Sequence, residues 1–416
     1  MEQPARRYGE GMDTYTITRL GIYGDGIAEG PVFAPMTLPG EMVSGTLTGS
    51  TLVDVKIVTP SEHRVAPPCP HFKSCGGCQL QHASDPLVAD FKTDIIVQAL
   101  AAQGIRTQIR PIVTSPAQSR RRATFAARRT KKGTMSGFHG RASGTVIEIP
   151  ECKLVEPQLL AARDIAEALA ELGGSRKATL AVTVTTSRVG LDIQVSGGKP
   201  IDGPLRITLA ALCDSRGFAR LTWEDEVIAQ RAPPVQRFGV ADVCPPPGAF
   251  MQATAHGEAH LLAAVHEAVQ GAKRVIDLFA GCGTFTLPLA RDAEVWALES
   301  DGQMLAAMDK GWRMAQGLKT VKHTARDLYR RPLLPDEFLK YDAVVMDPPR
   351  AGAEAQTAEL VRSGIRRIAY VSCNPVSFAR DVAVLVAGGF TLDWVQPVDQ
   401  FRWSSHVELA AQLSRV

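Results

Sequence analysis

The sequence predicts an α/β fold in which a doubly wound, mostly parallel sheet forms the C-terminal part and two β-rich parts precede it. Three observations support this prediction. From Val275 onward, short apolar runs alternate with helical stretches, as strand–helix units do. The run VIDLFAGCGT, residues 275–284, joins a buried strand to a Gly-rich turn and a helix start. Upstream, short β-type runs with Gly turns fill residues 15–59 and recur over residues 178–222.

The bulk properties exclude several classes of protein. The 416 residues are enough for two or three domains, and 45% of them are hydrophobic. A net charge of +3 says little about binding partners. No apolar run is long enough to span a membrane, and the N-terminal MEQPARRYGEGMD lacks the apolar core of a signal peptide. We therefore expect a cytoplasmic protein with no membrane partner and no obligate protein partner, whose eight cysteines do not form structural disulfides.

Residues 1–62 are expected to form a small barrel. The runs TYTITRLG, GPVFAPMTLPGE, MVSGTLTG and TLVDVKIVTP are short strands at close spacing. This stretch resembles the TRAM domain, an OB-like barrel found on RNA-modifying enzymes. The alternative is a barrel with only a structural or oligomerisation role.

The other two expected domains are interleaved in the sequence. Residues 63–83 plus 113–245 are expected to form a β-rich central domain that carries a cysteine cluster and a basic hairpin. A helical stretch from Ser84 to about Ala102 is expected to pack back onto the C-terminal domain. That domain therefore comprises residues 84–112 plus 246–416.

A cluster of cysteines follows the barrel. Cys69, Cys75 and Cys78 form the pattern C-x5-C-G-G-C, which places three thiols in one loop. Three thiolates imply a fourth ligand, and Cys152, in another Pro-marked loop, is the candidate. Four thiolates suit either zinc or a [4Fe-4S] cluster, and three buried structural thiols are the alternative. The isolated cysteines are expected to be small core or loop residues: Cys213, Cys244 and Cys282.

The segment from Arg120 to Arg141 carries eight basic residues and no acid. The residues TKKG, 130–133, predict a turn between two strands. Basic side chains can neutralise phosphates, and the interleaved aromatic residues Phe125, Phe138 and His139 can stack on unpaired bases. RNA is therefore an expected partner. The alternative is a solvated cationic face with phenylalanines in the core.

The Gly-rich turn predicts a nucleotide-like ligand. Gly281 and Gly283 let the backbone approach a ligand closely, and Glu299 at the tip of the next strand can accept hydrogen bonds from a ribose. A dinucleotide fingerprint needs a third glycine where this chain has Thr286, so a dehydrogenase fits poorly and S-adenosylmethionine fits better. A Gly turn in an ordinary α/β sheet is the alternative. Several candidate ligand contacts fall at or near strand ends: Phe279, Glu299, Asp327, Asp347 and Cys373.

Three motifs lie at the ends of the last strands. DPPR at 347–350 and SCNP at 372–375 each follow a buried strand, and HVE at 406–408 begins the last one. A cysteine at a strand tip, such as Cys373, is a candidate nucleophile, although a buried core cysteine is commoner. If the last strand runs antiparallel beside the strand of Cys373, Glu408 returns to the same edge. The alternative for Glu408 is an edge carboxylate in solvent.

With these motifs in this order, the chain resembles the RNA 5-methyluridine methyltransferases over nearly its whole length. The resemblance implies a class I (Rossmann-like) methyltransferase domain that uses S-adenosyl-L-methionine. It implies Cys373 as nucleophile and Glu408 as base. The implied cofactor contacts are Gln252, Phe279, Glu299 and Asp347. The implied cluster ligands are Cys69, Cys75, Cys78 and Cys152.

The resemblance also bears on the substrate. Members with both the cluster and the barrel resemble the 23S rRNA enzymes, so the implied target is C5 of a uridine in a single-stranded or loop region. A tRNA enzyme and a non-catalytic RNA-binding or ribosome-assembly protein are the alternatives. A 5-methylcytosine enzyme would need a second cysteine near Asp347, and an N6-adenine enzyme would not need Cys373. Two departures from the family pattern are Thr284, where relatives often have Asn, and the run FRWS at 401–404.

Overall fold

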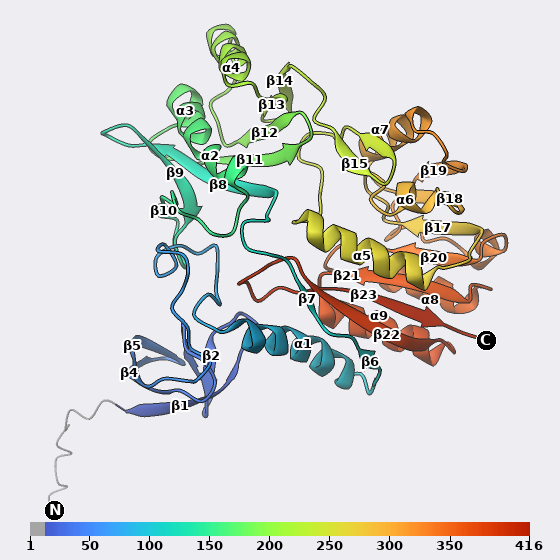
Figure 1. The fold of residues 1–416 in the computed structure, drawn as a ribbon, viewed down its shortest axis with the longest axis horizontal. Helices are drawn as coiled ribbons and strands as arrows, with labels where there is room; N and C mark the ends of the chain where they lie inside the picture. The colour runs from blue at the N-terminus through green and yellow to red at the C-terminus, as the bar shows by residue number, and fades with distance from the viewer. Residues whose placement is uncertain (1–12) are drawn as a thin grey trace, which may run out of the picture.

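The computed structural model describes residues 13–416. Figure 1 shows three parts: a small barrel in blue, a central sheet with helices in green, and a large sheet in yellow to red. The barrel is closed, with strand order β1-β2-β3-β5-β4. Its strands are β1 (Thr14–Leu20), β2 (Gly26–Ala28), β3 (Val32–Ala34), β4 (Met42–Thr48) and β5 (Thr51–Thr59). Ile17, Ala34 and Val43 fill its interior, so the predicted barrel is confirmed.

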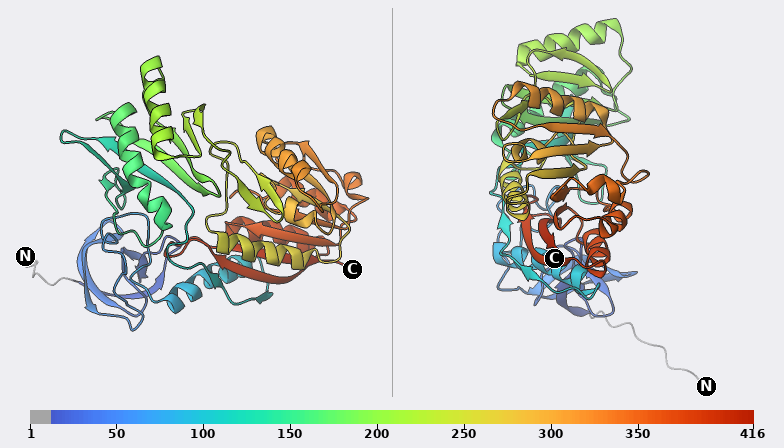
Figure 2. Two further views of the ribbon diagram at one scale, coloured as in Figure 1. Left: turned by 45° about the horizontal axis from the view of Figure 1, so that its top comes forward. Right: turned by 90° about the vertical axis from the view of Figure 1, so that its right-hand side faces the viewer.

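The central part is a seven-stranded sheet of order β10-β9-β8-β11-β12-β13-β14. Its strands are β8 (Arg122–Arg129), β9 (Thr134–His139), β10 (Val146–Ile147), β11 (Leu180–Ser187), β12 (Gly190–Ser196), β13 (Arg220–Trp223) and β14 (Glu226–Gln230). Its helices are α2 (Pro157–Ala161), α3 (Arg163–Gly173) and α4 (Gly203–Arg216). Helices α3 and α4 lie side by side over the sheet (Figures 1 and 2). Trp223 and Phe125 are fully buried in this core.

The basic hairpin forms as predicted, with β8 and β9 antiparallel around residues 130–133. Its aromatic residues behave differently from the expectation. The Phe125 ring is fully buried and stacks on Phe138 at 5.6 Å in the core, so the prediction that Phe125 stacks on a base is wrong. At the hairpin tip, Lys131 and Lys132 are exposed.

Arginines at the hairpin base point inward. Arg121 donates to the Gln252 carbonyl at 3.0 Å, and Arg122 donates to the Ala249 carbonyl at 2.8 Å. Both bonds join the central sheet to the segment that leads into the C-terminal domain. The basic residues of the hairpin therefore fall into two groups. The arginines at its base bind backbone carbonyl groups of the protein, whereas the lysines at its tip face solvent.

The C-terminal part is a nine-stranded sheet of order β19-β18-β17-β20-β21-β23-β22-β6, with β7 also paired to β22. Its strands are β6 (Gln108–Ile109), β7 (Val113–Thr114), β17 (Arg274–Leu278), β18 (Glu294–Glu299), β19 (Val321–Ala325), β20 (Ala343–Met346), β21 (Arg367–Ser372), β22 (Thr391–Asp399) and β23 (Glu408–Ser414). Strands β17 to β21 are parallel, and β23 inserts antiparallel beside β21 with Ser372 opposite Leu409. This register places the start of β23 next to the end of β21, as predicted.

Helices cover both faces of this sheet. They are α1 (Asp85–Ala101), α5 (Ala255–Ala268), α6 (Thr286–Leu289), α7 (Gly302–Met314), α8 (Glu354–Arg362), α9 (Pro375–Ala387) and the 3-10 helix η1 (Pro335–Phe338). The pair β15 (Gln236–Phe238) and β16 (Ala241–Val243) packs on α7. Helix α1 is capped by Ser84, which directly precedes it, and packs against α9, as expected for the helical stretch after the cysteine loop. No helix within residues 13–416 is long and apolar enough to cross a membrane.

Candidate active site

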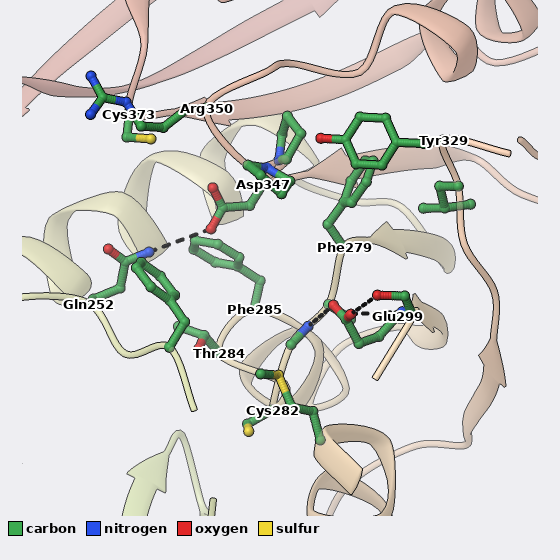
Figure 3. A pocket seen from close by; sticks show the side chains of 18 of the residues that line it. Gln252, Phe279, Cys282, Thr284, Phe285, Glu299, Tyr329, Asp347, Arg350 and Cys373 are labelled. Carbon is green, nitrogen blue, oxygen red and sulfur yellow. Dashed lines mark hydrogen bonds between the residues drawn. The ribbon is translucent and has the colours of Figure 1, made fainter. Parts of the chain in front are cut away.

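A cavity of about 420 Å³ lies at the carboxyl ends of β17, β18, β20 and β21 (Figure 3). This is the edge at which parallel α/β sheets bind their ligands. The residues predicted for catalysis and cofactor binding all line it: Gln252, Phe279, Glu299, Asp347, Cys373 and Glu408. Asp327 lines it as well. Figure 3 shows Cys373 and Arg350 at one side, Glu299 at the opposite side, and Asp347 and Phe279 between them.

The Gly-rich turn forms one wall of this cavity. Phe279 has a φ of 63°, and Gly281 and Gly283 have φ of 55° and 90°. A bulky residue in this left-handed region is an outlier of the kind that clusters at ligand sites. A side chain at Gly283 would come within 2.7 Å of Met308, so the turn needs glycine there. The helix that follows, α6, has only four residues, so the predicted strand–turn–helix unit has a very short helix.

Glu299 is held in place by backbone groups. Its carboxylate accepts hydrogen bonds from the N–H groups of Gly281 at 3.1 Å, Ser300 at 2.7 Å and Asp301 at 3.0 Å. These bonds fix the carboxylate at the tip of β18 and join it to the Gly-rich turn. Oε1 also accepts from Ser300 Oγ at 2.9 Å, whereas Oε2 accepts from Gly281 alone, so Oε2 keeps a lone pair for a bound hydroxyl group.

Cys373 lies where β21 turns into α9. Asn374 caps the helix by accepting from the Val376 N–H at 3.1 Å, and Pro375 occupies its first turn, so the chain must turn directly after the cysteine. The thiol is half-buried and lines the cavity, so it is not a sealed core cysteine. Burial, followed by the carboxyl groups of Glu408 and Asp347, raises the pKa of Cys373 to about 11. Positive charge bound nearby would lower that pKa.

Glu408 is almost completely buried, which excludes the edge carboxylate in solvent. Burial raises its pKa to about 7, and a hydrogen bond from Gln400 acts in the opposite direction. Asp347, at the end of β20, also has a pKa well above its usual range, because of burial and then the nearby carboxyl groups of Glu408 and Asp277. Gln252 donates to Asp347 across 3.5 Å. Two carboxyl groups and one thiol thus share a poorly solvated cavity, which is suited to proton transfer beside a nucleophile.

The four predicted metal ligands surround a second, small cavity. Cys69, Cys75, Cys78 and Cys152 all line it and are all buried. Within residues 13–416 none of them forms a disulfide, and no group of three or more His, Cys, Asp or Glu is arranged to hold a metal ion. Burial, together with the neighbouring thiols, raises the pKa of Cys78 to about 12. The donor set of four thiols around one small cavity fits the chemistry of a four-cysteine site.

Comparisons with known proteins decide the family. The family model described as tRNA (Uracil-5-)-methyltransferase matches residues 313–416. An RNA methyltransferase of Brucella suis is 43% identical, with 96% of this chain and 97% of the relative covered. The 23S rRNA (uracil(1939)-C(5))-methyltransferase RlmD of Alkalilimnicola ehrlichii is 30% identical, with 96% of each chain covered. The chain belongs to the RNA uracil-5-methyltransferase family.

Members of this family, the present chain included, are S-adenosylmethionine-dependent RNA (uracil-C5) methyltransferases. A solved structure has the same fold. It is the Pyrococcus abyssi tRNA (uracil-54, C5)-methyltransferase in complex with S-adenosyl-L-homocysteine, with a TM-score of 0.76 at 22% identity, covering 97% of this chain and 100% of that one. The predicted fold class is therefore confirmed.

For this uracil-5-methyltransferase, sequence reasoning missed several residues of the site. Gln400 donates to Glu408, and Arg350, Tyr329 and Phe250 line the cavity. Arg350 belongs to the DPPR motif, and the position of this motif directly after a buried strand could have indicated that Arg350 lies at the site. The other three lie in segments with no motif of their own, and only the folded chain brings them to the cavity.

Proposed function

We propose that this enzyme methylates C5 of a uridine in 23S ribosomal RNA through a covalent adduct with Cys373. The observation that carries the proposal is that Cys373 and Glu408 line one cavity with the predicted cofactor contacts. The name of the relative aligned over 96% of both chains supports the 23S target. A uridine of tRNA is the second candidate, because the description of the matching family model names tRNA. A non-catalytic RNA-binding protein has no support from these relatives.

The chemistry must overcome the low nucleophilicity of uracil C5. The Cys373 thiolate adds to C6, and the electron pair of the C5–C6 double bond moves toward the C4 carbonyl, which makes C5 nucleophilic. Bound S-adenosylmethionine would supply an electrophilic methyl group on its sulfonium ion. C5 would form a bond to this methyl carbon while the S–CH3 bond breaks, and S-adenosylhomocysteine would leave with that electron pair. Glu408 then removes the C5 proton, the double bond re-forms, and the Cys373 thiolate leaves. The target base must first leave its stack to reach the cavity.

The chain's own residues have separate tasks in this proposal. Gln252, Phe279, Glu299 and Asp347 bind the cofactor, with the Glu299 carboxylate facing its ribose. Phe279 supplies an apolar surface beside the Tyr329 ring, whose centre is 5.7 Å away. A pKa near 7 suits Glu408 to accept a proton at neutral pH.

We also propose that Cys69, Cys75, Cys78 and Cys152 hold a [4Fe-4S] cluster, with zinc as the alternative. The support is four buried thiols that line one small cavity. Such a cluster would cross-link the cysteine loop to the segment of Cys152, and the methyl transfer needs no electron from it. The barrel and the exposed hairpin lysines are the proposed RNA-binding surfaces. Iron, sulfide and zinc analysis of protein purified without oxygen tests the cluster.

Methyl transfer from tritiated S-adenosylmethionine, with 23S rRNA and tRNA assayed in parallel, tests the function. We expect label in 23S rRNA as 5-methyluridine and no label with Cys373→Ala, whereas Cys244→Ala, whose thiol lies outside the cavity lining, stays active. Glu408→Gln should retain a denaturant-resistant protein–RNA adduct, because the C5 proton stays in place. Label in tRNA alone would support the second candidate. Full turnover by Glu408→Gln would remove Glu408 from its role.

A further inference from the structure

Gln400 lies directly after β22 and is buried, with 2% of its surface exposed. Its side-chain oxygen accepts from the backbone N–H groups of Ala253 at 2.8 Å and Thr254 at 3.4 Å. Its amide nitrogen donates to Gln252 Oε1 at 2.5 Å and to Glu408 Oε2. Every hydrogen of this amide group is therefore used.

These bonds determine the orientation of the amide. The oxygen can only accept and the nitrogen can only donate, so the two backbone N–H groups on one side direct the NH2 group toward Glu408 and Gln252. Helix α5 approaches Gln400 closely at Gly257, where a side chain would come within 2.6 Å of the Gln400 Cβ atom. The surroundings of Gln400 therefore leave it little freedom to turn away.

We propose that Gln400 is a positioning residue, which orients the carboxylate of Glu408 toward the target base and links it to Gln252. The proposal rests on the proposed role of Glu408 as base. It explains why the amides of Gln400 and Gln252 form a continuous chain of hydrogen bonds from Glu408 to Asp347. These hydrogen bonds join Glu408, the proposed proton acceptor, to Gln252 and Asp347, which are proposed to bind the cofactor.

The hydrogen bond from Gln400 affects the ionisation of Glu408, because Glu408 is buried among other titratable groups. The titratable groups near Glu408 are Asp347 from the end of β20 and Cys373 from the end of β21, and Arg350 lies close to Cys373. Burial opposes ionisation of Glu408, whereas the hydrogen bond from Gln400 favours its charged form. Loss of that bond should therefore raise the pKa of Glu408 and misplace its oxygen.

The test is Gln400→Met, which keeps the length of the side chain and removes both donors. Methyl transfer to 23S rRNA at neutral pH should fall roughly ten- to a hundredfold, the range supported by a hydrogen bond to a charged group. The rising limb of the pH–rate profile should move to higher pH, because Glu408 must be ionised to accept the proton. The fraction of RNA held as a denaturant-resistant adduct should increase.

Gln412→Met is the matched control. Gln412 lies on β23, as Glu408 does, and donates to Asp393 at 2.9 Å outside the cavity. This variant should keep the wild-type pH profile and adduct level. If Gln400→Met does not fold, Gln400→Glu retains the acceptor for Ala253 and places a second carboxyl group beside Glu408, so the rising limb should move to still higher pH.

Three results would overturn the proposal. They are a wild-type pH profile and adduct level in Gln400→Met, an unshifted profile in Gln400→Glu, and an identical change in Gln412→Met. A different result would show that the proposed function itself is wrong. In that case Glu408→Gln itself traps no adduct, whereas a failure confined to Gln400 leaves the adduct of Glu408→Gln in place.

Discussion

The backbone carbonyl of Trp403 accepts a hydrogen bond of 2.9 Å from the N–H of Leu80, and the N–H of Gln79 donates to the same carbonyl at 2.8 Å. Trp403 has a φ of 62°, a conformation that bulky residues rarely adopt. It lies in the loop between β22 and Glu408, whereas Leu80 follows the cysteine loop. The residues directly after the cysteine loop are therefore in contact with the loop that leads into β23, the strand of the proposed base.

This contact predicts an effect of Cys78 on the loop between β22 and β23. In Cys78→Ser, the cysteine loop loses a proposed ligand, and amide hydrogen exchange should become faster at Leu80 and over residues 400–407. Exchange measured by mass spectrometry checks this. The control is Cys213→Ser, which changes a buried thiol on α4 that is distant in sequence from both loops. It should leave exchange in residues 400–407 unchanged. Equal exchange in the wild type and Cys78→Ser would show that the two loops are independent.

The carboxyl group of Glu408 should influence the reactivity of Cys373. Glu408 contributes to raising the pKa of this thiol, so Glu408→Gln should bring the pKa below its value of about 11. Since the thiolate is the reactive form, alkylation by iodoacetamide at pH 8 should become faster, roughly tenfold for each unit by which the pKa falls. Peptide mass spectrometry identifies the alkylated cysteine. Glu267→Gln, on the outer side of α5, serves as the control, and an unchanged rate in Glu408→Gln would contradict the prediction.

The buried ion pair between Lys92 and Asp399 should be important for stability. Lys92 Nζ lies 2.5 Å from Asp399 Oδ1, and the two side chains are 0% and 1% exposed. Lys92→Met leaves the Asp399 carboxylate buried without its cation, which costs about 3–5 kcal/mol of unfolding free energy. Thermal unfolding should show a lower Tm, and a second change, Asp399→Leu, should recover much of the loss. Arg206→Ala, which breaks an exposed pair with Glu226, should leave the Tm unchanged.

The tip of the basic hairpin should contribute to RNA affinity without supporting the fold. Lys131→Ala and Lys132→Ala should each weaken binding to RNA and reduce the slope of log K against log salt by about 1, as expected for the loss of a phosphate contact. Filter binding over a range of salt concentrations measures both. Lys340→Ala, an exposed lysine after η1, should change neither value. Salt dependence identical to the wild type in the tip variants would place the RNA elsewhere.

Much of the architecture could be predicted from local patterns. The barrel strands, the hairpin around residues 130–133 and the strand–helix units of the C-terminal sheet all follow from periodicity and turn residues that act over a few positions. The Gly-rich turn and the SCNP motif also carry their information locally. For this reason the amino-acid sequence is sufficient to place Phe279 and Cys373 at the edge of the sheet.

Other features depended on residues far apart in the chain. Phe125 is apolar and flanked by arginines, and only the packing of α3 on β8 decides that it lies in the core. Gln400 has no motif, and its contact with Glu408 arises because β23 pairs with both β21 and β22. The pKa of Glu408 likewise depends on burial by distant segments. Local sequence determines which element forms, whereas desolvation and hydrogen-bond partners at a site depend on which elements the tertiary fold brings together.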